Sequence, residues 1–370
     1  MNHRHFKQLP VYRSPCCYRP DPKKIRVFYW QPFCVVSSYS WQPLNQNIMK
    51  TLTKVALACF GILSAATSLR AQDPEFTQFY ANPIYLNPAL AGDKICPRVG
   101  LNYRVQWPNV YGTYTTLGAS FDRFVHNLKG GVGVTVVHDR AAQGSLNTTG
   151  IGAVYAPRIR LGKNTFISVG IQAGWWQKAV NWSMLTFGDQ IDPQDGFVYN
   201  TNETAPANAV QGDFDLGSGF VFTTRNIFVG AAVHHILEQN ESLLNGSSPL
   251  PRKYTVHAGG IIPLTKNSHE GDSYISPNFM YRQQGDFRQL NLGMYFKKER
   301  IVGGLWYRGN DSFIMLLGVE AGAMRIGYSY DVTVSKLTNA TAGSHEISLG
   351  YQFTCKAPVK KYRPGICPSW

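Results

Sequence analysis

A two-residue alternation of apolar and polar side chains recurs through the chain from Arg98 to Thr354. In FISVGIQAGWW at residues 166–176, Ile167 and Val169 share one face, while Ser168 and Gly170 share the other. Successive side chains of a β-strand point to opposite faces, so this period predicts strands with one apolar and one polar side. Fourteen such segments, an even number, are expected at residues 98–106, 112–122, 130–138, 146–156, 165–176, 213–223, 226–235, 253–263, 273–282, 287–296, 300–307, 312–320, 323–333 and 343–354.

The links and the two faces of these strands indicate how they assemble. Most links are short and polar or contain glycine, which is typical of an antiparallel up-and-down meander. The polar faces favour Gly, Ser, Gln and Asn, whereas a soluble β-sandwich, the alternative, should carry more Lys and Glu there. Aromatic residues gather at strand ends, as in the girdles of outer-membrane barrels: Trp107, Trp175, Trp176, Trp182, Trp306, Tyr328, Tyr330 and Tyr351. The sequence therefore predicts an all-β fold, a transmembrane antiparallel up-and-down β-barrel of about 14 strands spanning residues 98–354.

The beginning of the chain has the features of an export signal. Residues 49–71 combine Lys50 and Lys54, an apolar stretch at 55–66 and a small residue, Ala71, which is the layout of a secretory signal peptide. Residues 1–48 have no steady hydrophobic period, and we interpret them as a mis-assigned upstream extension, with a genuine cytoplasmic extension as the alternative. After residue 71 no apolar run approaches the roughly 18 to 20 residues of a membrane-spanning helix, so any membrane embedding must use strands.

The charge bears on a nucleic-acid partner, and the cysteine content bears on disulfide bonds. The formal net charge is +14, but residues 1–71 hold five Lys and five Arg against Asp21, so +9 of it belongs to them and +5 to the rest. The basic total therefore gives no reason to expect a nucleic-acid partner. Cys96, Cys355 and Cys367 follow the signal, and one disulfide with one spare thiol is possible in an oxidising compartment, with the pairing left open.

The segment at residues 72–97 has an unusual composition for the start of a mature chain. QFYANPIYLNPALAG at 78–92 places two Asn-Pro pairs among apolar residues. Proline lacks a backbone donor and favours extended geometry at the preceding residue, so the segment should be neither helix nor strand. Its side chains are too apolar for a free tail. We expect Phe79, Asn82, Pro83, Asn87 and Pro88 to pack in or beneath the barrel lumen, where protein surrounds irregular backbone.

No residue pattern in the chain indicates catalysis. His234 and His235 are adjacent in a strand, so they should face opposite sides and form part of a polar rim, with no shared metal. Glycines at 130–136 are expected to mark close packing against an interior segment, because the run lacks the Lys-Ser/Thr ending of a phosphate-binding loop. No spacing of Ser, His and acid marks a nucleophile. We therefore expect a non-enzymatic protein without cofactor or metal, with an outer-membrane lipase-like enzyme as a remote alternative.

Two longer links, 177–212 and 236–252, are the candidate binding surfaces, since loops on a rigid scaffold concentrate binding residues. A basic, proline-containing tail at 355–370 follows the last strand. The candidate partner-contact residues in the loops are Trp182, Phe187, Asp189, Asp192, Phe197, Tyr199, Leu243 and Leu244.

Several phrases occur in a fixed order along the chain. They are LNPALAG at 86–92, NYRVQWP at 102–108, YTTLGASFD at 114–122, LTFGDQID at 185–192, LPRKYTVHAGG at 250–260, LWYR at 305–308, IGYSYDVTVSKL at 326–337, SHEISLGYQF at 344–353 and CPSW at 367–370. Together they resemble the PorP/SprF family of type IX secretion system outer-membrane proteins. The resemblance implies an integral barrel in the bacterial outer membrane, in contact with its lipid, and a role in protein secretion, frequently alongside gliding motility.

The resemblance also implies the kind of partner. Members of the family look like accessory barrels that associate with periplasmic ring components of the secretion machinery, or with a secreted cell-surface protein that they help to export or anchor. The family has no catalytic residues to transfer. The sequence hypothesis is a docking, export-accessory or anchoring barrel. An outer-membrane porin or transporter for a small or hydrophobic solute is the alternative, distinguished by an open polar lumen.

Overall fold

The computed structural model describes residues 72–355 except residues 111, 163, 193, 195, 207–208, 244–245, 265–272, 310 and 335–341. The described residues belong to one compact unit, Ser68–Trp370. The predicted extension at 1–48, the predicted signal peptide at 49–71 and the tail beyond Cys355 lie outside the described residues. Among those residues, no helix is both long enough and apolar enough to cross a membrane.

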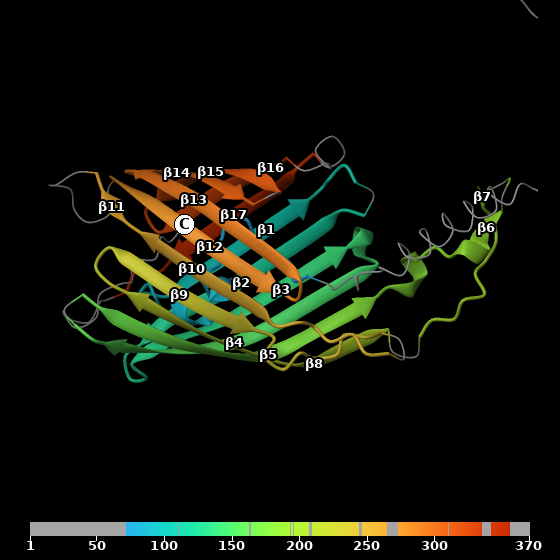
Figure 1. Cartoon of the computed structure of the whole chain (residues 1–370), viewed down its shortest axis with the longest axis horizontal. Helices are drawn as coiled ribbons and strands as arrows, with labels where there is room; N and C mark the ends of the chain where they lie inside the picture. The colour runs from blue at the N-terminus through green and yellow to red at the C-terminus, as the bar shows by residue number, and fades with distance from the viewer. Residues whose placement is uncertain are drawn as a thin grey trace, which may run out of the picture. The chain divides into compact units, whose positions relative to one another are not determined.

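Fourteen antiparallel strands form the wall of a closed barrel (Figure 1). Each follows its predecessor along the chain, and the predicted strands are all present: β1 has the predicted bounds, and the others have shifted ends, eight of them being longer than predicted. Their bounds are β1 (Arg98–Gln106), β2 (Tyr114–Val125), β3 (Gly130–Ala141), β4 (Leu146–Arg160), β5 (Phe166–Val180), β8 (Val210–Thr223), β9 (Ile227–His234), β10 (Lys253–Gly260), β12 (Ser273–Gln284), β13 (Phe287–Lys298), β14 (Ile301–Arg308), β15 (Ser312–Ala321), β16 (Met324–Thr333) and β17 (Ser344–Gln352). Short elements outside the wall are β11 (Ile262–Pro263), a two-strand ribbon of β6 (Ile191–Asp192) and β7 (Gly196–Phe197), and the 3-10 turns η2 (Ala142–Gly144), η3 (Trp182–Met184) and η4 (Gly188–Gln190).

Two pairings make the sheet a closed ring. β1 pairs with β17 with Arg98 opposite Gln352 and Gln106 opposite Ser344. β10 pairs with β12, from Lys253 opposite Gln284 onward. Every neighbouring pair is antiparallel, so the predicted up-and-down barrel of 14 strands is confirmed.

The faces of the strands are those of a membrane barrel. In β15, Phe313, Met315 and Leu317 are between 49% and 62% exposed on the outer face, while the inner-facing Ile314 and Leu316 are buried. An apolar outer face is the reverse of what a soluble sandwich requires, because there the apolar face would form the core. The apolar side chains of the alternation therefore form a lipid-facing exterior.

Two of the aromatic residues predicted for the girdles point inward instead. Adjacent strand residues face opposite sides, so only Trp175 of the Trp175–Trp176 pair faces outward, and Trp176 is buried in the lumen. Trp306 is also buried, because its neighbours Leu305 and Tyr307 occupy the outward positions of β14. The girdle prediction was wrong for these two tryptophans.

The two ends of the barrel differ, and we name them by their connections. The long-loop end carries residues 181–209 and 235–252, together with the β1–β2 and β16–β17 connections. The short-turn end carries the tight β2–β3, β8–β9, β13–β14 and β15–β16 turns and the β10–β12 link. The first strand begins and the last strand ends at the short-turn end.

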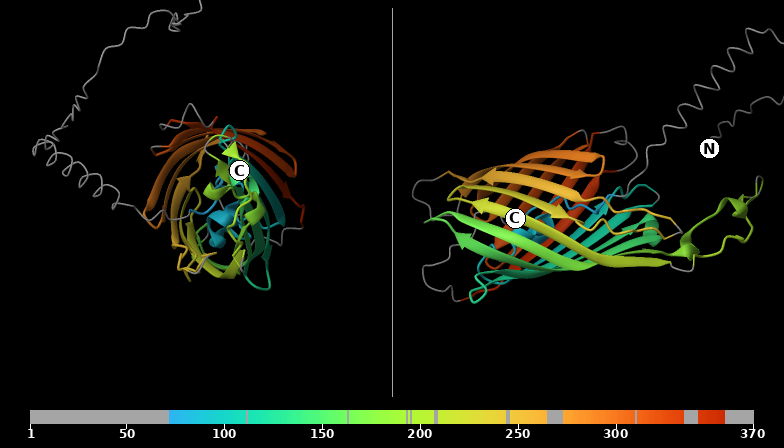
Figure 2. Two further views of the ribbon diagram at one scale, coloured as in Figure 1. Left: turned by 90° about the vertical axis from the view of Figure 1, so that its right-hand side faces the viewer. Right: turned by 60° about the horizontal axis from the view of Figure 1, so that its bottom comes forward.

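Residues 72–97 run through the lumen, and we call them the plug. In Figure 2 (left), which looks along the barrel, this blue segment lies inside the ring of strands. The plug contains a four-residue helical turn, α2 (Pro83–Leu86), and a 3-10 turn, η1 (Pro88–Leu90). The expectation that it contains no helix was wrong, because proline is well suited to the first position of a helical turn.

A disulfide joins the end of the plug to the end of the barrel. Cys96 precedes β1, Cys355 follows β17, and their Cα atoms are 5.5 Å apart. The bridge therefore links the two chain segments that meet at the β1–β17 seam, and it answers the pairing that the sequence left open for these two cysteines.

Candidate functional site

The start of the plug is bound by a buried charge cluster at the long-loop end, which we call the latch. It consists of Asp73, Asp215, His235, Lys253 and Gln284, all buried. The Asp73 carboxylate accepts a hydrogen bond from His235 Nε2 at 2.8 Å and lies 2.5 Å from Lys253 Nζ. Gln284 forms a reciprocal pair with Asp73, accepting from its backbone N–H at 3.1 Å and donating to Oδ1 at 2.9 Å.

The latch stabilises opposite charges within the protein. Burial by itself would raise the pKa of Asp73, but His235 and Lys253 hold it well below its usual value. Burial would likewise lower the pKa of His235, but the carboxylates of Asp73 and Asp215 raise it to about 9. At neutral pH, Asp73 is therefore an anion enclosed by two cations.

The two histidines of the latch region were predicted as a polar rim with opposed side chains, and this was wrong. His234 ends β9 with its side chain inward, and His235 has a φ of 55°, which ends the strand alternation. Both side chains are consequently buried inside the barrel. His235 also contacts the Trp176 ring edge-on at 5.0 Å between centroids.

A second polar group holds the next residues of the plug. Glu75 pairs with Arg282 at 3.0 Å, and its carbonyl accepts a hydrogen bond from Arg104 Nη1 at 2.8 Å. The backbone N–H of Thr77 donates to the Glu346 carboxylate at 2.5 Å. The first part of the plug is thus attached to side chains on strands β1, β12 and β17 through charges and hydrogen bonds.

The middle of the plug packs through aromatic and aliphatic groups. Phe79 meets Trp306 edge-on at 4.9 Å between ring centroids, and Tyr80 meets Phe228 and Tyr295 in the same way at 5.8 and 6.2 Å. Edge-on ring pairs at these separations add to the burial of apolar area. The plug residues buried here are Phe79, Tyr80, Ile84, Leu86, Ala89 and Leu90.

Glycines in the wall allow the last part of the plug to touch the strand backbone. A Cβ on Gly131 of β3 would lie 1.9 Å from the Ala91 carbonyl oxygen, and one on Gly170 of β5 would lie 2.2 Å from the Ala89 nitrogen. Contacts this short exclude any side chain. The predicted packing role of glycines at 130–136 agrees with the position of Gly131.

The two asparagines of the Asn-Pro pairs have different roles. Asn87 Nδ2 donates to the carbonyls of Phe220 and Ala231, both at 3.2 Å, and its Oδ1 accepts from the Ala89 N–H at 2.9 Å. Asn82 is buried, but its side-chain amide makes no hydrogen bond with any described residue. The second pair therefore anchors η1 to the wall, while the first starts α2.

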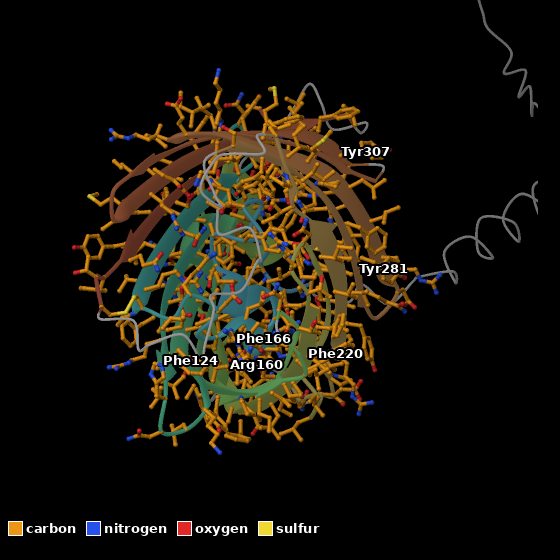
Figure 3. All side chains as sticks on the ribbon, turned by 90° about the vertical axis from the view of Figure 1, so that its left-hand side faces the viewer. Phe124, Arg160, Phe166, Phe220, Tyr281 and Tyr307 are labelled. Carbon is orange, nitrogen blue, oxygen red and sulfur yellow. A yellow bond between two sulfur atoms is a disulfide. The ribbon has the colours of Figure 1, made fainter. Side chains whose placement is uncertain are left out.

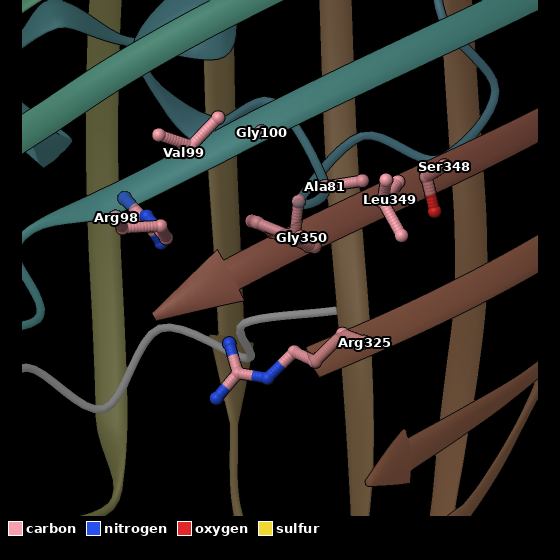
Figure 4. A pocket seen from close by; sticks show the side chains of 9 residues that line it. Ala81, Arg98, Val99, Gly100, Arg325, Ser348, Leu349 and Gly350 are labelled. Carbon is pink, nitrogen blue, oxygen red and sulfur yellow. The ribbon is translucent and has the colours of Figure 1, made fainter. Parts of the chain in front are cut away.

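The lumen is filled where the structure describes it. Seen from the short-turn end, side chains occupy the space inside the ring (Figure 3). A cavity of about 30 Å³ lies between the plug and strands β1, β16 and β17, lined by residues that include Tyr80, Arg98 and Arg325 (Figure 4). This volume is of the order of one water molecule, far below that of a solute-binding pocket.

The described residues of 235–252, which we call the lid loop, include buried side chains beside the latch and exposed ones such as Leu237. Glu241 is buried, accepts from Trp176 Nε1 at 2.9 Å and pairs with Lys178. Leu250 is buried, and the Pro251 carbonyl accepts from Gln284 at 3.2 Å. Of the predicted contact residues here, Leu243 is half-buried and Leu244 lies outside the described residues.

The described residues of 181–209 extend beyond the wall, and we call them the projecting loop (Figure 1). Asp189 orders it by accepting hydrogen bonds from Thr201 Oγ1 at 3.0 Å and from the Asn202 N–H at 2.7 Å. Asp192 accepts from the Tyr199 hydroxyl at 3.0 Å. These two predicted contact residues therefore shape the loop from within.

The projecting loop exposes a group of large apolar side chains. Trp182 and Phe187, two predicted contact residues, are half-buried, and their rings meet at a tilt with 4.9 Å between centroids. Phe197 and Tyr199, also predicted, are 65% and 57% exposed. The exposed group, which we call the ribbon patch, consists of Met184, Ile191, Phe197, Val198 and Tyr199.

Sequence reasoning missed the latch and the second polar group. Their signal was present as charged residues on the polar faces of strands, such as Arg104, Lys253, Arg282 and Glu346. A charged side chain on the inward face of a barrel strand requires a buried partner. These four charges therefore indicated that a segment inside the lumen carries polar partners for them. The plug residues Asp73 and Glu75 precede the Asn-Pro motifs that drew attention first.

Comparison with known proteins identifies one family and gives distant structural likenesses. The family described as type IX secretion system membrane protein PorP/SprF matches residues 68–351. None of the curated proteins matches the chain. Similar solved structures include a KdgM porin, at 9% identity and a TM-score of 0.33 over 70% of this chain and 99% of that one. A TodX deltaS2S3 mutant, a monoaromatic hydrocarbon channel, has 11% identity and a TM-score of 0.41 over 73% and 94%. Omp33 of Acinetobacter baumannii has 8% identity and a TM-score of 0.38 over 70% and 99%.

Proposed function

The chain belongs to the PorP/SprF family of type IX secretion system membrane proteins, and from this we propose that it is a closed docking barrel of the outer membrane. In this proposal the barrel anchors a secreted cell-surface protein, or assists its export, through the projecting loop. The role is non-enzymatic and uses no cofactor and no nucleic acid. The observation that carries the proposal is the combination of a filled lumen with an exposed apolar loop.

The plug and the lid loop support docking over conduction. A porin or solute transporter requires an open polar path, whereas here the plug meets the wall by backbone contact at Gly131 and Gly170. The lid loop also has buried side chains beside the latch, including Glu241 and Leu250. A barrel closed in this way offers its surfaces, and not its lumen, for binding.

The position of the projecting loop favours a partner outside the cell. Barrels of this type have short turns on the periplasmic side and longer loops on the extracellular side. The first and last strands also begin and end at the short-turn end, as for a chain delivered from the periplasm. The ribbon patch then faces the cell exterior, where a secreted surface protein is available and periplasmic ring components are not.

The chemistry of the ribbon patch suits a protein partner. Exposed aromatic and aliphatic side chains on and beside the β6–β7 ribbon provide anchors that lose little conformational entropy on binding. Phe197 and Tyr199 are such anchors, and the hydrogen bond from Tyr199 to Asp192 fixes one of them.

Site-specific photo-crosslinking in intact cells tests this proposal. A photoreactive amino acid at position 197 should crosslink to a secreted surface protein, while one at Leu237, 51% exposed on the lid loop, should not. The double variant F197S/Y199S should lower recovery of the same partner from mild-detergent membranes by about tenfold or more, as for interface anchors. The matched control is L237S. Equal recovery with F197S/Y199S and with unmodified protein would refute the role of the ribbon patch.

A further inference from the structure

Exposed charges are distributed unequally between the two ends of the barrel. Within the described residues, the short-turn end has one exposed acid, Glu299, against six exposed bases: Arg123, Lys129, Arg160, Arg225, Lys298 and Arg300. Among the residues described at the long-loop end, five acids are exposed, Asp189, Glu203, Asp213, Glu238 and Asp286, against three exposed bases, Arg140, Arg252 and Arg288. We call the six bases of the short-turn end the basic rim.

Each base of the rim lies within two residues of a large, exposed apolar side chain. Arg123 follows Phe121 on the outer face of β2, and Lys298 follows Phe296 on the outer face of β13. The apolar neighbours are between 40% and 59% exposed: Phe121, Leu128, Ile159, Leu161, Ile227, Phe296 and Ile301. For Arg123, Arg160, Arg225, Lys298 and Arg300, this arrangement places an apolar strand residue in the hydrocarbon and the cation one or two residues further out, at the depth of the headgroups.

The rim is spread around the barrel and is not concentrated in one patch. Its members lie at the β2–β3, β4–β5, β8–β9 and β13–β14 turns, which are distributed around the ring. Arg160 marks this end in Figure 3. Arg123, Lys129, Lys298 and Arg300 form no ion pair with any described residue, unlike the inward-facing Lys297, which pairs with Glu320.

From these observations we propose that the basic rim binds the phosphate groups of anionic phospholipids in the leaflet that surrounds the short-turn end. The occupant is a ring of lipid headgroups, which contacts all sides of the barrel at one depth. A single protein partner would contact one side of the mouth and would not require each cation to lie within two residues of an exposed apolar side chain. The lipid shell thereby fixes the depth and tilt at which the projecting loop is presented.

Lipid selectivity of the purified full chain in vesicles tests the proposal directly. We would reconstitute the protein in phosphatidylcholine vesicles and measure the motionally restricted fraction of spin-labelled phosphatidylglycerol and of spin-labelled phosphatidylcholine. The phosphatidylglycerol label should be selected by about fivefold for a phosphate held by one cation at low salt. The preference should fall towards one at 1 M salt, where the screening length is about 3 Å.

Two matched triple variants locate the effect. R123Q/K298Q/R300Q should lose most of the selectivity, whereas R140Q/R252Q/R288Q, which removes the three exposed bases of the opposite end, should keep it. Lys129 is left in place because its φ of 50° would strain most replacements. Both variants change exposed side chains, and the circular dichroism of the β-sheet checks that each barrel is folded.

Other outcomes would overturn the proposal. Equal association of both labelled lipids with the unmodified protein, or equal loss in the two triple variants, would remove the basic rim as a lipid site. Unchanged lipid selectivity in R123Q/K298Q/R300Q, with loss of an acidic periplasmic protein from purified membranes, would assign the rim to a protein partner. None of these measurements depends on the ribbon patch, so they are independent of the docking proposal.

Discussion

At the scale of single residues, Asp73 is a buried carboxylate in contact with two buried cationic side chains. The Asp73 carboxylate contacts Lys253 at the start of β10, Gln284 at the end of β12 and His235 directly after β9. Its partners are buried as well, so removing the carboxylate leaves cations that water cannot reach. Breaking one partner of a buried ion pair costs far more than breaking a surface pair.

We expect D73N to lower the free energy of unfolding by about 3 to 5 kcal/mol. Thermal unfolding in detergent, followed by the circular dichroism of the β-sheet, measures the change. The control is E238Q, which breaks the pair between Arg252 and Glu238, whose side chains are 45% and 44% exposed. That control should cost at most about 1 kcal/mol. Similar losses in both variants would mean that the latch does not stabilise the plug.

The latch also predicts a pH dependence. His235 has a pKa raised to about 9, so its contribution is complete below its unfolded pKa of about 6.5 and is lost as pH rises through about 9. Asp73 has a lowered pKa, so its contribution is complete above about pH 4 and is lost as pH falls towards the folded value. We therefore expect a stability loss between pH 6.5 and 9 that is absent in H235Q. Parallel pH profiles for the two proteins would contradict this.

At the scale of elements, the plug packs closely on the wall where the strands carry glycine, which has no side chain. Gly170 lies under η1, where a Cβ would stand 2.2 Å from the Ala89 nitrogen. By contrast, Gly303 of β14 occupies an outward position, and no atom lies within 4 Å of the place that a Cβ on it would take. The two glycines therefore separate an effect on the plug from a general effect on strands.

We predict that G170V displaces the plug and destabilises the protein by about 1 to 3 kcal/mol, the usual cost of overpacking. Limited proteolysis should then cut residues 72–97 faster, because they no longer pack on the wall. G303V is the control and should leave both stability and proteolysis unchanged. Resistance of the G170V plug to protease would show that the wall accommodates it.

The sequence predicted the positions of the strands well, but it predicted the conformation of the plug and of the two long loops less well. The period of two located all the wall strands. The two Asn-Pro pairs and the apolar composition around them placed Phe79, Asn82, Pro83, Asn87 and Pro88 in a segment that the structure has inside the lumen. The sequence did not anticipate the helical turn at Pro83, because local propensity alone does not show that the wall will support it. Nor did it separate the two long loops, since both are polar and glycine-bearing.

At the scale of the whole molecule, the part of the chain that the structure describes is a barrel with an occupied lumen and a long projecting loop. Its lumen contains the plug, residues of the lid loop contact the latch and the wall beside it, and the cavity between the plug and strands β1, β16 and β17 is of the order of one water molecule. Fourteen strands would otherwise enclose a wide interior. Closure of the whole molecule therefore depends on the plug.

This predicts a difference in ion conductance. The full chain should give no steady current in planar bilayers, whereas deletion of residues 73–92 should give stepwise openings, because it removes the element that fills the lumen. G170V retains the plug residues and should therefore show openings less often than the deletion variant. It provides the same test if the deletion variant does not fold. Steady ohmic current through the unmodified protein would favour the porin alternative.

The sequence alone determined the strand count, the faces and the order of the barrel, because a period of two is a local property that any membrane strand must obey. It also marked the plug by composition. Only the tertiary structure decided which residues meet: the Asp73 latch, the glycine contacts, the Cys96–Cys355 bridge and the different courses of the two loops. These depend on contacts between residues far apart in the chain, and closure of the ring sets the distances between them.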